Sequence, residues 1–568
     1  MSFSTLAFEV LLTRIFAIGQ WNHLSFMVIS IALFGFGASG IFLSMVEMSR
    51  KRQFQPPVST TTISVLLFLF STAQIFSFLL LNHMPLDYFR LAVEPLQGLV
   101  LFAAYLLLAL PFFFSGLIVS IGYTTMPAKA GLVYFASMAG SALGAGIPIL
   151  ALPFLDEGRL IIISAAGALI PAALTSLKSI FKTNKGIAEQ TFWYNLALIG
   201  SLAIIVVGVA SLTIAVNPII RVSPSPYKAL GQILQLPETH IVESKTGIRG
   251  RIDRVKTPYI RFAPGLSLKY PHTLPSQNVI YRDGDNPLVL YDLKEKSDAD
   301  FAAFMLSFAG YRQIRQPEEA LLIQQGGGSA VPSAIASGAD HISIIEQNRS
   351  VANMLRRQYR LPVINRDPRP FLAQDKKRYD IIHVENWGAS ILGAAALNQE
   401  HIFTIEAFGE YWNHLTPSGV IIVSRKLLLP PSDALRLWST AYEALKKNGV
   451  KRPQSHLVLL RNFDTFTLLV SKAPVNAKDI IEFARRKNFD LVFFKDIQPD
   501  MANRFHVFEE PYHFQEISKL AASYESGRQN KFFRTYLLDV KPQSDKRPFP
   551  GRFLKWSKVQ ALYESLGS

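Results

Sequence analysis

The residues with the clearest chemical potential are a run of glycines and several acids, each directly after a short apolar run. Residues 320–323 form one such run, and the loop 324–328, QQGGG, follows it at once. Glycine lets a backbone approach a ligand closely, so three in a row between a strand and a helix indicate a nucleotide pocket. Glu346 ends a second apolar run, where a carboxylate can accept hydrogen bonds from both hydroxyls of a ribose. The plain alternative for the glycines is a tight strand-to-helix turn.

The elements that must position these residues alternate in type along the chain. We expect strands at 320–323, 341–345, 361–364, 379–384 and 419–424, with a helix at 329–337 after the glycine loop. Short buried strands separated by helical segments are typical of a doubly wound parallel sheet. A helix near 432–447 precedes two alternating runs, 456–460 and 465–470, which predict an antiparallel hairpin at the end of the sheet. Asp367 and Glu385 follow the third and fourth strands, so these acids share one edge of the sheet.

The sequence resembles a known family, the spermidine synthases and related class I methyltransferase-fold proteins, in particular their multi-pass membrane relatives. The resemblance rests on the segments ALLIQQGGG, SIIEQN, NRDPRPFL, YDIIHVENW, HIFTIEAFGEYWNHLTPSGVIIVSRK, YRDGDN and FEVLLTRIFAIGQWNHLSFMVISIALFGFGASG. It implies an α-helical membrane domain followed by an α/β doubly wound, class I methyltransferase-like Rossmann domain. It also implies a small β domain in front, which covers the nucleotide pocket. The DGDN turn at 283–286 predicts a hairpin there. The alternative is a linker with one hairpin.

The family's binding residues can be carried over to matching positions. The resemblance implies that Gly326 and Gly328 lie against the nucleoside and its methionine part, that Glu346 binds the ribose and that Asp367 contacts the adenine. The ligand implied is S-adenosylmethionine or its decarboxylated form. The first loop glycine of the family is Gln324 here, which narrows the turn. Each acid also has an ordinary alternative, because acids at strand ends often only cap a helix or start a turn.

The catalytic residues match the family less well. Spermidine synthases carry two acids after the fourth strand, which hold and deprotonate the attacking amine. The resemblance implies that Glu385 is the first of these, while Gly388 stands in the place of the second. An amine must be neutral to attack, so it needs a proton acceptor within hydrogen-bond reach. His383 on the same strand is better explained as a core histidine. We expect a small-molecule acceptor, with an amine as one candidate.

Composition excludes several other classes of chemistry. The 568 residues include no cysteine, which rules out thiolate catalysis, disulfides and cysteine-based metal sites, and we expect no metal. The formal net charge is +16, which in a soluble protein would suggest nucleic acid as a partner. Basic residues beside membrane spans also set topology and meet anionic lipid headgroups. We therefore expect a lipid bilayer, not nucleic acid, as the partner of this charge.

The first 216 residues contain apolar runs long enough to cross a bilayer. Six lie near 24–46, 59–82, 97–122, 130–153, 160–177 and 193–216, and a shorter one lies at 3–19. Glycines such as Gly35, Gly37, Gly40 and Gly144 allow close approach of packed helices. Arg14 and Glu9 are expected to pair with neighbours, because ionisable groups in lipid usually do so.

The basic residues between these runs leave the sidedness of the large domain open. The positive-inside rule places 50–52, Lys129 and the lysines of 178–185 on the cytoplasmic side. The run at 193–216 then delivers the large domain to the outer side, although nucleosides of this kind are cytoplasmic. Either one run, with 130–153 the first suspect, does not span, or the domain is not an enzyme. We expect a multi-pass protein of a bacterial inner membrane.

The domain prediction is a transmembrane domain at 1–216, a small β or linker domain at 217–316, a nucleotide-binding domain at 317–475 and a C-terminal helical extension at 476–568. Three functions remain open. The first is a membrane-tethered transferase that moves a methyl or aminopropyl group from S-adenosylmethionine or its decarboxylated form. The second is a regulatory nucleotide-binding protein without catalysis, and the third is a transporter with a sensor domain. The oligomeric state is not indicated by the sequence.

Overall fold

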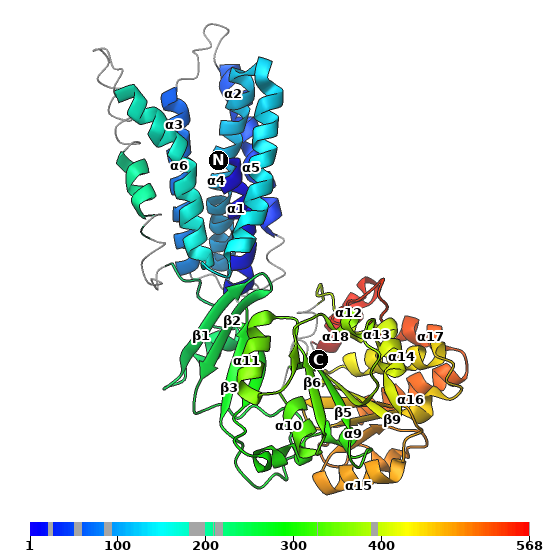
Figure 1. The fold of residues 1–568 in the computed structure, drawn as a ribbon. Coiled ribbons are helices and arrows are strands. Elements are labelled where there is room, and N and C mark those ends of the chain that lie inside the picture. Colours follow the sequence, from blue (N-terminus) through cyan, green and yellow to red (C-terminus); the bar gives the residue numbers. More distant parts are fainter. Residues whose placement is uncertain are drawn as a thin grey trace. The chain divides into compact units, whose positions relative to one another are not determined.

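The protein forms two compact units (Figure 1). The structure is a computed structural model, which describes residues 1–20, 27–49, 60–84, 94–180, 199–207, 210, 220–325, 328–387 and 396–566. The helical unit comprises residues 1–232 and 244–252, and the α/β unit comprises 233–243 and 253–568. Each unit has an apolar core of its own. The expected boundary at 216 lies outside the described residues and stays a prediction.

Long apolar helices make up the helical unit. They are α1 Ser2–Gly19, α2 Met27–Ser49, α3 Thr60–His83, α4 Pro95–Thr125, α5 Ala130–Ala151 and α6 Glu157–Ile180. Among the described residues, five segments are long and apolar enough to cross a membrane. Each covers all or most of one of the helices α1 to α5. The predicted run at 160–177 coincides with α6, whereas most of the run at 193–216 lies outside the described residues. The suspected segment at 130–153 is a helix of sufficient length and hydropathy.

Small residues and hydroxyl groups bring these helices together. A Cβ added to Gly144 would lie 2.2 Å from the Phe3 carbonyl oxygen, and one added to Gly35 would lie 2.6 Å from that of Ala109. Close helix approach is therefore confirmed at these two glycines. Added Cβ atoms at Gly37 and Gly40 would meet nothing within 4 Å, so the prediction was wrong for them.

Polar groups of the helical unit pair with each other. Ser4 Oγ donates to Gln74 Oε1 at 2.9 Å, and Gln74 Nε2 donates to the Ser4 carbonyl oxygen at 3.0 Å. Arg14 Nη2 lies 3.7 Å from Glu157 Oε1 on α6, so the expected pairing of Arg14 is confirmed. Such pairing lowers the cost of placing polar groups among apolar helices.

A four-stranded sheet precedes the large sheet. It is built from β1 His240–Gly247, β2 Gly250–Lys256, β3 Gln277–Arg282 and β4 Asp285–Tyr291, in that order. The predicted hairpin is confirmed, because β3 and β4 pair antiparallel around Asp283 and Gly284. Both turn residues have positive φ, 50° and 76°, as a tight two-residue hairpin turn requires.

The large sheet has eight strands in the order β12-β10-β11-β9-β8-β5-β6-β7. They are β5 Glu319–Gln325, β6 His341–Ile345, β7 Val363–Ile364, β8 Tyr379–Glu385, β9 Leu415–Lys426, β10 Leu457–Arg461, β11 Thr465–Ser471 and β12 Asp490–Phe493. The first five of these strands pair parallel. The β10–β11 hairpin joins β9 antiparallel. The predicted parallel strands and closing hairpin are confirmed, and this strand order is that of the class I methyltransferase fold with β12 added.

Helices connect the strands of this sheet and surround it (Figure 1). They are α9 Phe308–Tyr311, α10 Ala330–Ala336, α11 Arg349–Tyr359, α12 Pro368–Leu372, α13 Ile405–Asn413, α14 Asp433–Lys447 and α15 Ala477–Lys487, followed after the last strand by α16 Tyr512–Glu525, α17 Gln529–Thr535 and α18 Val559–Leu566. The short helix α8 Ala229–Ile233 precedes both sheets. Side chains cap the first turns of α11, α12, α13 and α15. The Asn348 side chain accepts bonds from the backbone N–H groups of Ser350 and Val351 at the start of α11.

The sequence predicted a helical extension at 476–568, but this C-terminal segment is not only helical. It supplies β12, which pairs with β10, and an irregular stretch from 539 to 553 that packs on α14. The buried Arg436 of α14 donates to the carbonyl oxygens of Asp539, Phe549, Pro550 and Arg552. Its guanidinium also lies 4.3 Å from the Phe553 ring centroid. Periodicity could not show this, because β12 and the stretch depend on partners far away in sequence.

The β3–β4 hairpin lies directly against the glycine loop. Gly328 has a φ of 74°, and a Cβ added to it would lie 2.2 Å from the Val289 carbonyl oxygen of β4. Only glycine permits this backbone approach at positive φ. The expected cover of the loop by the small β domain is thus present at Gly328.

Gly328→Ala should therefore force the hairpin away from the loop, at a cost of about 2–5 kcal/mol from strain and overpacking. The matched control is Gly338→Ala, where φ is 76° but the added Cβ meets nothing within 4 Å. The free energy of unfolding of that variant should fall by only about 1–2 kcal/mol. Thermal unfolding and hydrogen exchange of β4 would measure both. Equal losses in the two variants would contradict the close approach.

Candidate functional site

The acids expected to bind a ligand lie at one edge of the large sheet. Glu346 directly follows β6, and Glu385 is the last residue of β8. Asp367 lies three residues after β7. These strands run parallel, so their carboxyl ends meet at the same edge. Gly326 and Gly388, which belong to the predicted binding and catalytic segments, lie outside the described residues.

Glu346 is a buried carboxylate at the tip of β6. Its side chain is 3 % exposed, and Oε1 accepts a bond from the Asn348 N–H at 2.7 Å. Arg282 Nη2, from the end of β3, lies 3.8 Å from the same oxygen. The hairpin thus adds a cation beside the acid. Sequence reasoning missed Arg282, because nothing in the local pattern indicates which strand end will meet Glu346.

Asp367 takes the role of a helix cap. It is exposed, and its Oδ1 accepts a bond from the Arg369 N–H at 3.1 Å at the start of α12. The helix-cap alternative therefore describes this side chain as it stands in the structure. Contact with an adenine ring stays a prediction.

Glu385 is fully buried and holds the first turn of α10. Its Oε1 accepts bonds from the Ser329 N–H at 3.1 Å and from the Ser329 hydroxyl at 2.5 Å. Its Oε2 accepts from the Ala330 N–H at 3.1 Å. These bonds tie the end of β8 to the glycine loop that follows β5. In this conformation both carboxylate oxygens are engaged within the protein.

Glu385 is buried near the aromatic side chains of Tyr291 and Tyr311. Burial raises the pKa of Glu385 to about 7, although the bonds from Ser329 and Ala330 oppose this shift. Burial, together with the nearby Glu385 charge, also raises the pKa of Tyr291 and Tyr311 well above the ordinary value. A carboxyl with a pKa near 7 can exchange a proton at neutral pH.

His383 lies next to this cluster as a neutral core residue. Its Nδ1 lies 3.1 Å from the Tyr311 hydroxyl, and burial lowers its pKa to about 3. The interpretation as a core histidine fits this environment. Its Nε2 is buried without a hydrogen-bond partner among the residues that the structure describes.

A second charged cluster, at Arg425 near the end of β9, escaped sequence analysis. Arg425 Nε contacts Asp433 Oδ2 at 2.5 Å, and Nη1 lies 3.6 Å from Glu400 Oε2. Nη1 also donates to the Asn386 carbonyl oxygen at 3.0 Å. Burial raises the pKa of Glu400, and the nearby positive charge of Arg425 lowers it in part. Glu400 thus places a second acid beside Asn386, the residue after Glu385. The only sequence signal was a basic residue following a buried strand.

The C-terminal stretch supports this side of the sheet. Asp545 accepts bonds from Arg369 Nη1 at 2.9 Å and from Thr404 Oγ1 at 2.7 Å. The Pro548 carbonyl oxygen accepts a bond from the Glu400 N–H at 2.8 Å. The segment 544–549 therefore holds the part of the chain that carries Glu400.

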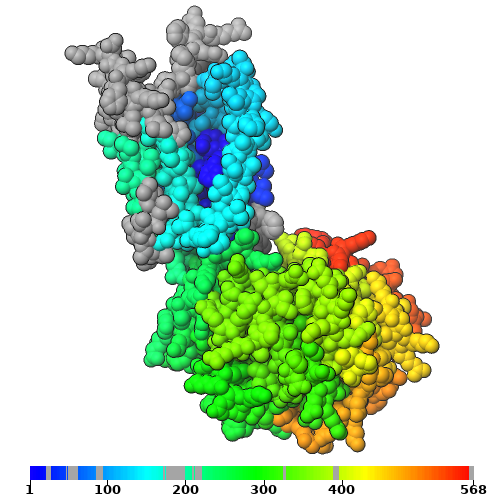
Figure 2. Space-filling model, viewed as in Figure 1, coloured from blue at the N-terminus to red at the C-terminus, as the bar shows by residue number. Residues whose placement is uncertain are grey.

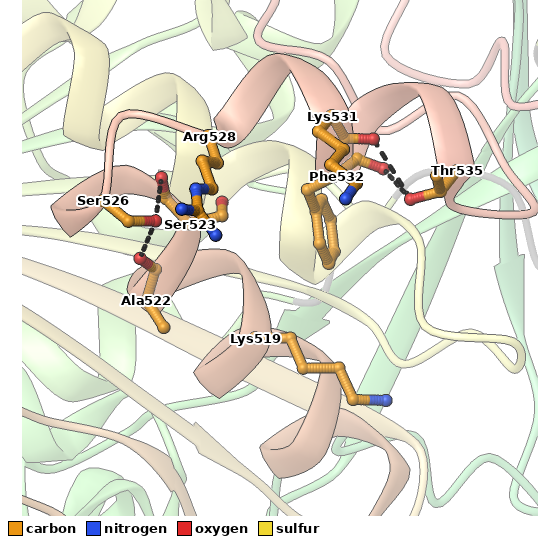
Figure 3. Close-up of a pocket in the computed structure, with 8 residues that line it drawn as sticks. All are labelled: Lys519, Ala522, Ser523, Ser526, Arg528, Lys531, Phe532 and Thr535. Carbon is orange, nitrogen blue, oxygen red and sulfur yellow. Dashed lines mark hydrogen bonds between the residues drawn. The ribbon is translucent and has the colours of Figure 1, made fainter.

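A surface depression of about 270 Å³ lies elsewhere, between α16 and α17 (Figure 3). Its lining residues are Lys519, Ala522, Ser523, Ser526, Arg528, Lys531, Phe532 and Thr535. Ser526 and Thr535 direct their hydroxyls to carbonyl oxygens of the helices themselves, at 2.9 Å and 3.1 Å. None of the predicted site residues lines this depression.

Comparison with known proteins gives structural neighbours only. No family model and no curated protein sequence matches the chain. A spermidine synthase in complex with the transition state analogue AdoDATO is 17% identical over 49% of this chain and 87% of its own, with a TM-score of 0.30. The spermidine synthase from Thermotoga maritima is 16% identical with the same coverage and a TM-score of 0.30. The N-methyltransferase NodS from Bradyrhizobium japonicum WM9, in complex with S-adenosyl-L-homocysteine, is 14% identical over 29% of this chain and 83% of its own, with a TM-score of 0.20. These TM-scores are low, so the description of the fold rests on the strand order of the large sheet and not on these neighbours.

The pKa of Glu385 predicts a pH-dependent stability. Its folded pKa of about 7 exceeds the value of about 4.3 in an unfolded chain, so the native state holds a proton that the unfolded state has lost between these values. This contribution to stability is present below the unfolded pKa and disappears as the pH rises through about 7. Glu385→Gln cannot titrate, so thermal unfolding from about pH 5 to 8 should favour the variant progressively over the parent. Parallel profiles would contradict the raised pKa.

Proposed function

We propose that the α/β unit binds an S-adenosyl nucleoside at the carboxyl edge of its sheet. The observation that carries this proposal is Glu346, a buried carboxylate at the tip of the second strand of a methyltransferase-type sheet. An acid at that place is suited to the two hydroxyls of a ribose. Gly328, where only glycine fits, keeps the loop backbone close to the neighbouring hairpin on the same edge.

In this proposal the chain is a membrane-tethered transferase. The donor is S-adenosylmethionine or its decarboxylated form, and the group moved is a methyl or an aminopropyl group. The proposed proton acceptor is Glu385, since a pKa of about 7 suits proton transfer at neutral pH. The five apolar helices among the described residues support the tethering, because each has the length and hydropathy of a span.

A second candidate is a regulatory protein that binds the nucleoside without turnover. The observation in its favour is that both oxygens of Glu385 are occupied by the first turn of α10. Glu385 would then hold the loop in place. Nucleoside affinity in the parent without release of a transferred group would support this candidate, whereas turnover lost in Glu385→Gln with affinity retained would support the transferase.

Glu346→Ala should lower the affinity for S-adenosylmethionine by about 30- to 1000-fold, because two charge-assisted hydrogen bonds to the ribose are lost. Calorimetry on the purified full-length protein in detergent measures this change. The control is Asp340→Ala, an exposed acid before the other end of the same strand, which should bind as the parent does. Unchanged affinity in Glu346→Ala, or no binding by the parent, would refute the proposed site.

The protein should not be an efficient spermidine synthase. A polyamine carries several positive charges at neutral pH, so its site needs acids both to neutralise the charge and to accept the proton. Here Glu385 is occupied, and Glu400, a further acid beside Asn386, faces Arg425. The assay supplies full-length protein with decarboxylated S-adenosylmethionine and putrescine, and separately with S-adenosylmethionine and membrane extract. Rapid spermidine formation that disappears in Glu385→Gln would overturn this prediction.

A further inference from the structure

The last part of the described chain displays large apolar side chains to solvent. Trp556 is 92% exposed, Leu554 is 52% exposed and Val559 is 43% exposed. Figure 2 shows the end of the chain, in red, on the surface of the α/β unit. An exposed tryptophan beside two exposed aliphatic residues is unusual for a protein surface that meets only water.

The fold holds this display in place. Exposure alternates along residues 552–556, where Phe553 is buried and Lys555 is half-buried between exposed neighbours. Phe553 and Lys555 turn inward: the Phe553 ring lies under Arg436, and Lys555 Nζ donates to the carbonyl oxygens of Phe533 at 2.7 Å and Tyr536 at 2.6 Å. Leu554 and Trp556 are therefore held outward. We call the exposed residues Arg552, Leu554, Trp556 and Val559 the Trp556 face.

Basic residues outnumber acids in the segment that carries the Trp556 face. Residues 541–558 contain six basic residues and one acid: Lys541, Lys546, Arg547, Arg552, Lys555 and Lys558 against Asp545. Lys541, Lys546 and Arg552 are exposed. Tryptophan prefers the headgroup level of a bilayer, and basic residues are attracted to anionic lipid. Apolar side chains rimmed by cations are typical of a surface that lies on a membrane.

We propose that the Trp556 face docks on the anionic surface of a phospholipid bilayer. This is a peripheral contact, additional to any helix that crosses the membrane, and it rests on the proposed tethering only for the proximity of a bilayer. Leu554 and Val559 favour lipid over nucleic acid, because aliphatic side chains gain nothing from a phosphate backbone and do not stack on bases. The positive charge disfavours a second copy of the same face, since the two would repel.

The absence of cysteine permits a direct test on the full-length protein. Ser557→Cys, at an exposed position beside Trp556, carries an environment-sensitive fluorophore, and Val507→Cys, 70% exposed and outside the tail, is the matched control. Each labelled protein is placed in nanodiscs of phosphatidylcholine alone or mixed with phosphatidylglycerol, some with brominated acyl chains. The same proteins held in an amphipathic polymer are offered vesicles of both compositions, so that docking is tested whether or not the helices insert.

The expected result is a blue shift and loss of most of the emission at 557 with brominated anionic lipid, and no change at 507. Adding Trp556→Ser, or Arg552→Gln with Lys558→Gln, should abolish most of this quenching, as should 1 M salt, where the screening length is about 3 Å. Equal responses at the two positions, a response to added RNA in place of anionic lipid, or one that depends only on protein concentration would overturn the proposal. Failed nucleoside binding would leave these readouts unchanged, so the two proposals fail separately.

Discussion

The site depends on one buried carboxylate and the groups that it holds. Glu385 joins the end of β8 to the first turn of α10. It thereby links β8 to the glycine loop that follows the neighbouring strand β5. A buried charge without partners would be very costly, so these bonds and the glycine loop stabilise each other. The β3–β4 hairpin rests on the same loop through Gly328. Catalytic use of Glu385 would need this connection to rearrange.

The alternation of strands and helices was predictable because it depends on local pattern. Buried strands such as Ala320 to Ile323 are apolar on both faces, and the hairpin turn at Asp283 and Gly284 carries its own backbone preference. The alternation predicted a parallel sheet, whereas the order of its strands comes from the structure. β12 was missed although Leu491 to Phe493 is a short apolar run, because no local signal shows that this run pairs with β10.

The site was only partly predictable, because side-chain partners come from distant segments. Sequence position placed Glu346, Asp367 and Glu385 at one edge, and the structure agrees. It could not show that Arg282 would meet Glu346, or that Glu400 would meet Arg425. Nor could it distinguish a ligand-binding aspartate from a helix cap at Asp367, since both occupy the same place after a strand. These outcomes depend on tertiary contacts, for which local periodicity has no signal.

The Arg436 arrangement also bears on how the chain is made. This guanidinium is buried in α14, yet its carbonyl partners lie about a hundred residues later, between Asp539 and Arg552. During synthesis, α14 leaves the ribosome long before those partners exist, and an unpaired guanidinium cannot be buried cheaply. The nascent α/β unit must therefore keep this face of α14 hydrated until residues 539–552 have been synthesised. Ribosomes that stall before this segment would release a polypeptide whose core is still open, which exposes it to proteases and chaperones.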